Sequence, residues 1–303
     1  MEPLPPLPLE PWEPTKNTLH LWVQIVGKVK MASLPPRNHW WHVPLYVDVR
    51  GLTTHLLHAA DGSPFEIRFD LLEHELVVET PTERRTIELR DGLSVADFDR
   101  RLHEALGDLD VQILEKPFGV PAFTTPFPED REHATYDPEA VERFWRVLDW
   151  SDGVFDEFSS WFCGKQSPVH LFWHSLDLAV TRFSGKRATT LPEADAVTNE
   201  AYTHELVSFG FWAGDANLRE PAYYSYTFPE PDALRERPLA PAQARWTEQG
   251  AGSLAILPYE VVRTAPDPRQ TLLEFLESAY EAGADAAGWD RAGLMSTWCP
   301  IPA

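Results

Sequence analysis

Cysteine is scarce in this chain, whose 303 residues include only Cys163 and Cys299. Two cysteines exclude a disulfide framework and a structural zinc site built from cysteines alone. Long apolar runs are also missing: none approaches the roughly 18–20 residues of a membrane-spanning helix, and no segment has the layout of a signal peptide. We therefore expect a soluble, cytoplasmic protein without a membrane partner.

Basic residues are few as well. The chain has 26 lysines and arginines against 47 aspartates and glutamates, which gives a formal net charge of −21. Proteins bind nucleic-acid phosphates mainly through lysine and arginine, so we expect no nucleic-acid partner. Any lysine or arginine that points inward is then more informative, because the bulk charge does not explain it.

The familiar catalytic motifs are absent too. There is no glycine-rich phosphate loop, no G-x-S-x-G elbow, no dinucleotide fingerprint and no helical H-E-x-x-H. Core-forming residues are abundant instead: 43% of the chain is hydrophobic, with 16 Phe, 12 Trp and 8 Tyr. A chain of this length and composition can bury a large core, yet no motif names a reaction.

Runs typical of strands dominate both halves of the chain, and each half ends in an amphipathic helical pattern. The first helix begins after Ser94, a typical N-cap, and the second has Pro268 in its first turn. Runs of strands followed by a few helices favour an α+β fold over a doubly wound one. We predict two antiparallel-sheet lobes, each with following helices.

The distribution of proline suggests how these lobes are divided. The chain begins with a proline-rich segment, which we expect to be an extended arm, and a second proline-rich stretch separates the two halves. The predicted parts, packed as one globular unit, are an arm (1–16), a first lobe (17–118), a crossover (119–138) and a second lobe (139–303).

Residues 17–30, "NTLHLWVQIVGKVK", alternate between two kinds of side chain. Apolar residues such as Leu19 and Leu21 share one parity, whereas His20, Gln24 and Lys28 share the other. Alternation with period two predicts a strand with one core face. The polar parity is either wetted by solvent or lines a pocket.

A related pattern recurs in "VHLFWHSLDLAVTR", residues 169–182. Both segments begin with an apolar residue followed by His-Leu, and both precede another histidine-bearing segment, at His42 and at His204. The recurrence suggests an internal pseudo-duplication, with chance similarity of short strands as the alternative.

The candidate site combines residues from these segments. Histidines near neutrality can transfer protons or ligate a metal, and lysine or arginine can hold a carboxylate or phosphate. The candidate catalytic residues are His170, His204, His20 and His42, and the candidate substrate-binding residues are Lys28, Arg182, Gln24 and Tyr224. The alternative is that these histidines lie on solvated faces of amphipathic strands. A divalent metal is only weakly indicated, because no close His-x-His pair occurs, and the cofactor stays unknown.

Several long motifs resemble signatures of an uncharacterised bacterial family, domain of unknown function 5996. They are "TLHLWVQIVGKVKMASLPPRNHWWHVPLYVDVRGLTT", "SPVHLFWHSLDLAVTRFSGKRA", "AYTHELVSFGFWAGD" and "LPYEVVR". The resemblance runs from about Leu7 to Ala292 and implies a single-module cytosolic protein, but it supplies no reaction, cofactor or catalytic residue. His174 stands where we associate the family pattern with a small residue, so it is a weaker catalytic candidate than His170.

These observations lead to two competing functional predictions. The first is an enzyme that acts on a small anionic metabolite in a histidine- and aromatic-lined cleft between the two sheets. The second is a non-catalytic protein that uses the same cleft to bind a small molecule or a partner. A purely structural role without a cleft is a third alternative, and the oligomeric state is open.

Overall fold

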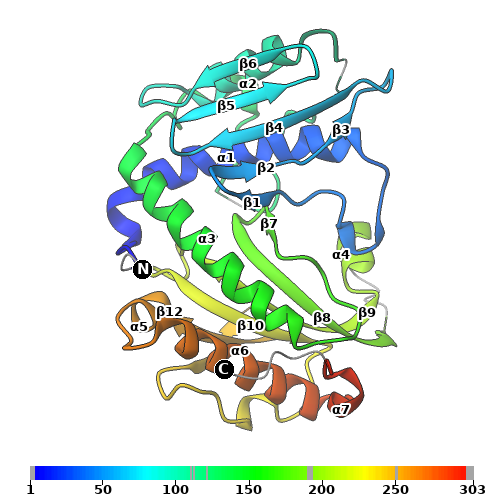
Figure 1. Cartoon of the computed structure of the whole chain (residues 1–303). Coiled ribbons are helices and arrows are strands. Elements are labelled where there is room, and N and C mark those ends of the chain that lie inside the picture. Colours follow the sequence, from blue (N-terminus) through cyan, green and yellow to red (C-terminus); the bar gives the residue numbers. More distant parts are fainter. Residues whose placement is uncertain are drawn as a thin grey trace.

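Two six-stranded antiparallel sheets form the framework of the computed structural model (Figure 1). The structure describes residues 4–109, 111, 113–120, 122–189, 194–249 and 252–297. The predicted α+β fold with two antiparallel-sheet lobes is therefore confirmed. Cys299 lies outside the described residues, and Cys163 is exposed.

The first sheet has the strand order β1-β2-β4-β5-β6, with β3 paired to β4. Its strands are β1 (Tyr46–Asp48), β2 (Gly51–Thr53), β3 (Leu57–His58), β4 (Pro64–Asp70), β5 (Glu75–Glu79) and β6 (Arg84–Glu88). The second sheet has the order β11-β12-β10-β9-β8-β7. Its strands are β7 (His170–Phe172), β8 (Asp177–Arg187), β9 (His204–Trp212), β10 (Ala222–Phe228), β11 (Arg245–Gln249) and β12 (Gly252–Pro258).

Helices cover the sheets and connect them. The α-helices are α1 (Leu9–Ser33), α2 (Val95–Leu106), α3 (Pro138–Ser160), α4 (Ala196–Ala201), α5 (Tyr259–Arg263), α6 (Pro268–Ala286) and α7 (Arg291–Leu294). Short 3-10 turns are η1 (Asn38–Trp40), η2 (Gly107–Leu109), η3 (Phe127–Glu129) and η4 (Leu234–Glu236). Among the described residues, every helix is too short or too polar to cross a membrane.

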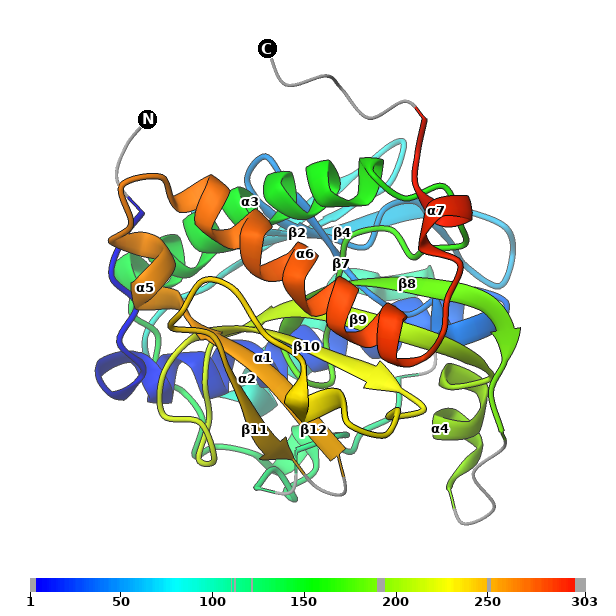
Figure 2. The ribbon, with the colours of Figure 1, turned by 90° about the horizontal axis from the view of Figure 1, so that it is seen from below.

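The second sheet is covered differently on its two sides. Helices α3 and α6 pack together over one side, as the view from below shows (Figure 2). On the other side α1 approaches the sheet, where Lys16 Nζ donates a hydrogen bond to the carbonyl of Gly214 at 2.7 Å. The two lobes also meet through an antiparallel backbone bridge between Leu45 and Leu171.

The segment 17–30 is helical, so its predicted strand is wrong. It lies within α1, which begins at Leu9 and carries Pro14 inside it, so the proline-rich start is also helical from Leu9 instead of extended. From Thr18 to Lys30 every residue is buried. A helix that is buried on all sides needs no apolar stripe with helical spacing. The alternation of residue types in this segment therefore does not distinguish a strand from a buried helix.

The second segment of the proposed duplication is a β-hairpin. His170 pairs with Ala179 across β7 and β8, and the chain turns between Trp173 and Leu176. Because the first segment is a helix and the second a hairpin, the two do not form the predicted pair of equivalent strands.

The helix boundaries expected from capping are confirmed. The Ser94 hydroxyl accepts a hydrogen bond from the backbone N–H of Asp97 at 3.1 Å, which begins α2. Helix α6 begins at Pro268, after the N-cap Asp267. Local signals of this kind depend only on neighbouring residues, which explains why they can be identified in the sequence.

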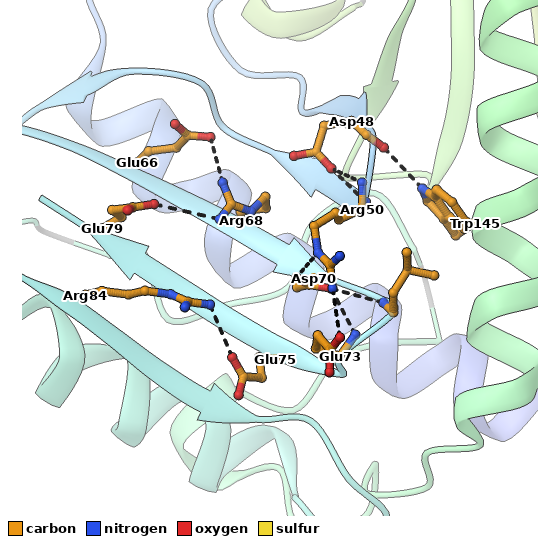
Figure 3. Close-up of polar contacts among 12 residues, drawn as sticks. Asp48, Arg50, Glu66, Arg68, Asp70, Glu73, Glu75, Glu79, Arg84 and Trp145 are labelled. Carbon is orange, nitrogen blue, oxygen red and sulfur yellow. Dashed lines mark hydrogen bonds and ion pairs between the residues drawn. The ribbon is translucent and has the colours of Figure 1, made fainter.

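The outer face of the first sheet carries charged pairs (Figure 3). Arg68 lies 3.9 Å from Glu66 and 3.7 Å from Glu79, and Arg84 lies 3.5 Å from Glu75. Glu66 and Arg68 alternate along β4 with buried apolar residues, as expected for a strand with one solvated face. This face is exposed to solvent, and exposed ion pairs of this kind contribute little to the stability of the fold.

The same region joins the first sheet to α3. The Trp145 indole N–H donates to the carbonyl of Asp48 at 3.2 Å, and Arg50 pairs with the buried carboxylate of Asp70 (Figure 3). The Trp145 bond holds the edge of the first sheet against the helix that covers the second sheet, and the Arg50–Asp70 pair lies within the first sheet region.

Candidate functional site

One stripe of α1 carries the polar residues that the sequence grouped together. His20, Gln24 and Lys28 are spaced by four residues, which places them on one face of a helix as it would on one face of a strand. The predicted grouping is therefore preserved although the predicted conformation is not.

Two residues of this stripe hold neighbouring chain segments. The His20 Nε2 lies 3.0 Å from the carbonyl of Trp173, to which it donates. The Gln24 side chain accepts a hydrogen bond from the backbone N–H of Phe118 at 2.8 Å and donates one to its carbonyl at 2.9 Å. Both Trp173 and Phe118 line a cavity, so His20 and Gln24 position its walls.

The cavity has a volume of about 670 Å³ and lies against the second sheet. The lining residues come from β8, β9 and β10 on one side and from α1, η1 and α4 on the other. None of the described lining residues belongs to β1–β6, so this cavity is not located between the two sheets as the sequence interpretation assumed.

Alternate residues of the strands form the cavity floor. Along β8 these are Asp177, Ala179, Thr181 and Phe183, which share one face. Thr181 pairs in register with Ser208 of β9, and their hydroxyls are 2.9 Å apart. The floor is therefore a mixture of small, hydroxyl-bearing and aromatic side chains with one acid at its end.

Lys28 supplies the cationic group of the cavity. Its residue is only 5% exposed, and Nζ lies 5.7 Å from the Trp173 ring centroid and 5.9 Å from that of Phe127. Within the part of the chain that the structure describes, Nζ has no carboxylate partner and no hydrogen-bond acceptor. Burial lowers the pKa of Lys28. The two rings compensate the ammonium only in part.

Asp177 supplies an acidic group on the floor. Its carboxylate accepts hydrogen bonds from the hydroxyls of Ser175 and Tyr224. Burial, together with the nearby Asp177, holds the pKa of Tyr224 well above its usual range, so Tyr224 stays protonated and donates. Tyr224 thus lies in the cavity, as a substrate-binding role requires.

His174 lines the cavity in the same turn as Ser175. Burial lowers the pKa of its imidazole, and the Asp177 carboxylate opposes that shift. The sequence interpretation ranked His174 below His170 and missed Asp177, which falls on the opposite parity from His170 in an unbent strand. The turn at Leu176, with φ of 54°, brings these residues to the cavity. The opposite parity of Asp177 and His170 in the sequence already indicates a turn or bulge at "SLD", and the structure has the turn there.

The four candidate catalytic histidines do not meet in this cavity. His42 accepts a hydrogen bond from the backbone N–H of Arg37 at 3.2 Å, and the ring of His204 contacts that of His39 at 5.4 Å. His170 is fully buried, and neither ring nitrogen has a partner among the described residues.

The buried histidines are also poorly suited to proton transfer. Burial lowers the pKa of His20 and of His170 to about 3. Both imidazoles are therefore neutral near pH 7. In the described ranges, no three His, Cys, Asp or Glu side chains are grouped so that they could hold a metal ion.

Arg182 lies on the opposite face of the second sheet from the cavity. Its guanidinium stacks on the Phe158 ring at 3.5 Å, and Nη1 lies 3.9 Å from a carboxylate oxygen of Glu277. Burial lowers the pKa of Arg182 to about 10. Arg182 borders a separate small cavity of about 130 Å³, so it cannot share a ligand with Lys28.

His39 is a cavity residue that the sequence did not identify. Its Nδ1 donates to the carbonyl of Ala201 at 3.0 Å, and Nε2 is 2.6 Å from Nζ of Lys165. The adjacent Trp40 indole donates to the carbonyl of Val197 at 3.1 Å. These bonds join η1 to α4 and close one wall of the cavity.

A family model described as a family of unknown function (DUF5996) matches residues 4–296. The chain belongs to this family. No curated protein and no solved structure gives a significant match.

Proposed function

We propose that this protein binds a small organic anion in the cavity beside the second sheet, with Lys28 holding the acid group. The observation that carries the proposal is Lys28, a cavity-lining residue only 5% exposed, whose Nζ has no anionic partner among the described residues. An uncompensated buried charge is costly, and a carboxylate or phosphate of a ligand would compensate it.

The walls indicate what the remainder of the ligand is like. Six of the aromatic residues that line the cavity are Trp40, Trp41, Phe172, Trp173, Phe183 and Trp212. Aromatic walls around a few polar groups are typical of sites for small organic molecules, and a volume of about 670 Å³ is within their usual range. We expect an apolar, preferably flat, ligand body.

A matched pair of fluorescent probes tests the role of Lys28. The anion 8-anilinonaphthalene-1-sulfonate and the neutral N-phenyl-1-naphthylamine have the same ring system. We expect the wild-type protein to bind the sulfonate at least about tenfold more tightly, because a hydrogen bond to a charged group contributes about 1.5–3 kcal/mol. Lys28→Met should remove this difference. The exposed Lys186 provides the control Lys186→Met, which should retain it. Equal affinities in the wild type would contradict the proposal.

An enzymatic function of the same cavity is the second candidate. It is favoured by the placement of the His174 imidazole in the wall near Asp177, where a histidine and a carboxylate could move a proton. Wild-type protein and His174→Ala, both able to bind the sulfonate probe, would be incubated with a metabolite extract and followed by ¹H NMR. Consumption of a compound by the wild type alone supports catalysis, whereas no consumption supports a binding protein.

A further inference from the structure

We propose that the ligand is a zwitterion whose carboxylate binds Lys28 and whose ammonium group binds Asp177, with an apolar body between them. This inference rests on the proposed function, because it assigns a second charged group to the same ligand. Lys28 belongs to α1 and Asp177 to β8, and both line the same cavity.

The partners of Asp177 show why a cation is expected there. Asp177 is 8% exposed, and its carboxylate oxygens accept hydrogen bonds from two neutral hydroxyls, those of Ser175 and Tyr224. Across the described ranges, no lysine or arginine forms an ion pair with it. Each carboxylate oxygen can accept a further hydrogen bond. A ligand ammonium would supply both the missing charge and a donor.

Lys28 and Asp177 do not neutralise each other's charge. Lys28 and Asp177 have opposite charges and share a cavity, yet they form no ion pair. Each group is therefore available for a ligand.

Apolar side chains line the cavity beside each of these two groups. The Trp173 ring stands beside Lys28, and Ala179 follows Asp177 along the floor. An ammonium and a carboxylate on adjacent atoms would leave this surface uncovered, so the ligand's charges are expected at separate ends of an apolar body.

Calorimetric titration with two isosteric ligands tests the assignment. The zwitterion 4′-(aminomethyl)biphenyl-4-carboxylate and the anion 4′-ethylbiphenyl-4-carboxylate differ only in the ammonium group. We expect the wild type to bind the zwitterion about tenfold to hundredfold more tightly. Asp177→Asn should remove this preference while it changes the affinity for the ethyl compound less than about threefold. Asp99→Asn, which alters a buried carboxylate of α2, should retain the preference.

Two further measurements keep the test decisive if Asp177→Asn does not fold. Tyr224→Phe leaves the carboxylate in place but removes one of its neutral donors, so Asp177 should depend more on the ligand ammonium and the preference for the zwitterion should rise; a fall would contradict the role of Asp177. L-Tryptophan carries its charges on adjacent atoms and should bind at least about tenfold more weakly than the biphenyl zwitterion. Similar affinity for L-tryptophan would overturn the separation of the two charges.

The outcomes separate this inference from the proposed function. If the two biphenyl compounds bind the wild type equally and both depend on Lys28, the zwitterion is wrong and the anion site stands. If neither compound binds and the sulfonate probe shows no dependence on Lys28, the anion site itself is wrong, and this inference fails with it.

Discussion

The side-chain amide of Gln24 forms hydrogen bonds with both the backbone N–H and the carbonyl of Phe118. The two residues are 94 positions apart in the chain. The Gln24 amide satisfies both backbone groups of one loop residue, as a residue of a paired antiparallel strand would. Gln24 is fully buried, so these two hydrogen bonds attach the loop that contains Phe118 to α1.

We predict that Gln24→Met destabilises the protein and weakens binding of the sulfonate probe. The substitution keeps the shape of the side chain but removes both hydrogen bonds, and each backbone group left without a partner costs about 1–3 kcal/mol. Urea unfolding measures the first effect and probe fluorescence the second. Gln270→Met, at an exposed position of α6, is the control and should change the free energy of unfolding by less than about 0.5 kcal/mol. Unchanged stability in Gln24→Met would contradict this role.

Two helical glycines should respond in opposite ways to alanine. A Cβ on Gly27 would lie 2.2 Å from the Trp173 ring, which must then move and lose the hydrogen bond from its indole to the carbonyl of Val43. We expect Gly27→Ala to destabilise the fold by at least about 1–3 kcal/mol. A Cβ on Gly153 meets nothing within 4 Å, so Gly153→Ala in α3 should stabilise it by up to about 1 kcal/mol. Thermal unfolding measures both changes, and a tolerated Gly27→Ala would refute the close approach of α1 to Trp173.

Gly210→Ala should alter ligand binding through Tyr224. A Cβ at this position would lie 2.5 Å from the Tyr224 hydroxyl and 2.5 Å from the carbonyl of Leu178. The ring must shift and leave Asp177, because the backbone carbonyl cannot move as readily as a side chain. We expect changed affinity for the biphenyl zwitterion together with a loss of stability, measured by calorimetry and urea unfolding. If Gly210→Ala had the wild-type affinity and the wild-type free energy of unfolding, the position of the Tyr224 ring would not require glycine at residue 210.

The buried histidines should make the protein sensitive to acid. For His170 the folded-state pKa is about 3, below the ordinary value near 6.5, so the unfolded chain binds more protons between these two values. The stability contribution of neutral His170 is therefore complete above about pH 6.5 and is lost as the pH falls towards 3. The loss approaches about 1.4 kcal/mol per pH unit for one such group.

Urea unfolding between pH 7 and pH 4 tests this dependence. His170→Leu should reduce the slope of stability against pH, whereas His58→Gln, at an exposed position, should leave it unchanged. An identical slope in wild type and His170→Leu would show that His170 is protonated in the folded state or accessible to solvent.

The parts of the fold that depend on local signals could be predicted from the sequence. The caps at Ser94 and Asp267 and the alternating burial of β4 follow from residues a few positions apart. The conformation of residues 17–30 could not be predicted, because a helix buried on every side shows no apolar stripe. The spacing of His20, Gln24 and Lys28 fits one face of either structure, so the three residues share a face although the predicted strand is wrong.

The cavity depends on contacts that no local pattern encodes. Its walls combine α1 and η1 with the turn before Asp177 and with α4, and both of these lie far from α1 and η1 along the chain. Asp177 reaches the cavity only because the chain turns at Leu176, and His39 only because η1 is bound to α4. Lys28 was identifiable because a lysine within an apolar segment is unexpected in a chain with so few basic residues.

The crystal structure of the protein with bound 8-anilinonaphthalene-1-sulfonate tests the central claim most directly. We predict that the rings lie against the aromatic walls and that a sulfonate oxygen lies about 2.7–3.2 Å from Nζ of Lys28. A probe bound elsewhere, or one whose sulfonate points away from Lys28 into solvent, would contradict the anion site.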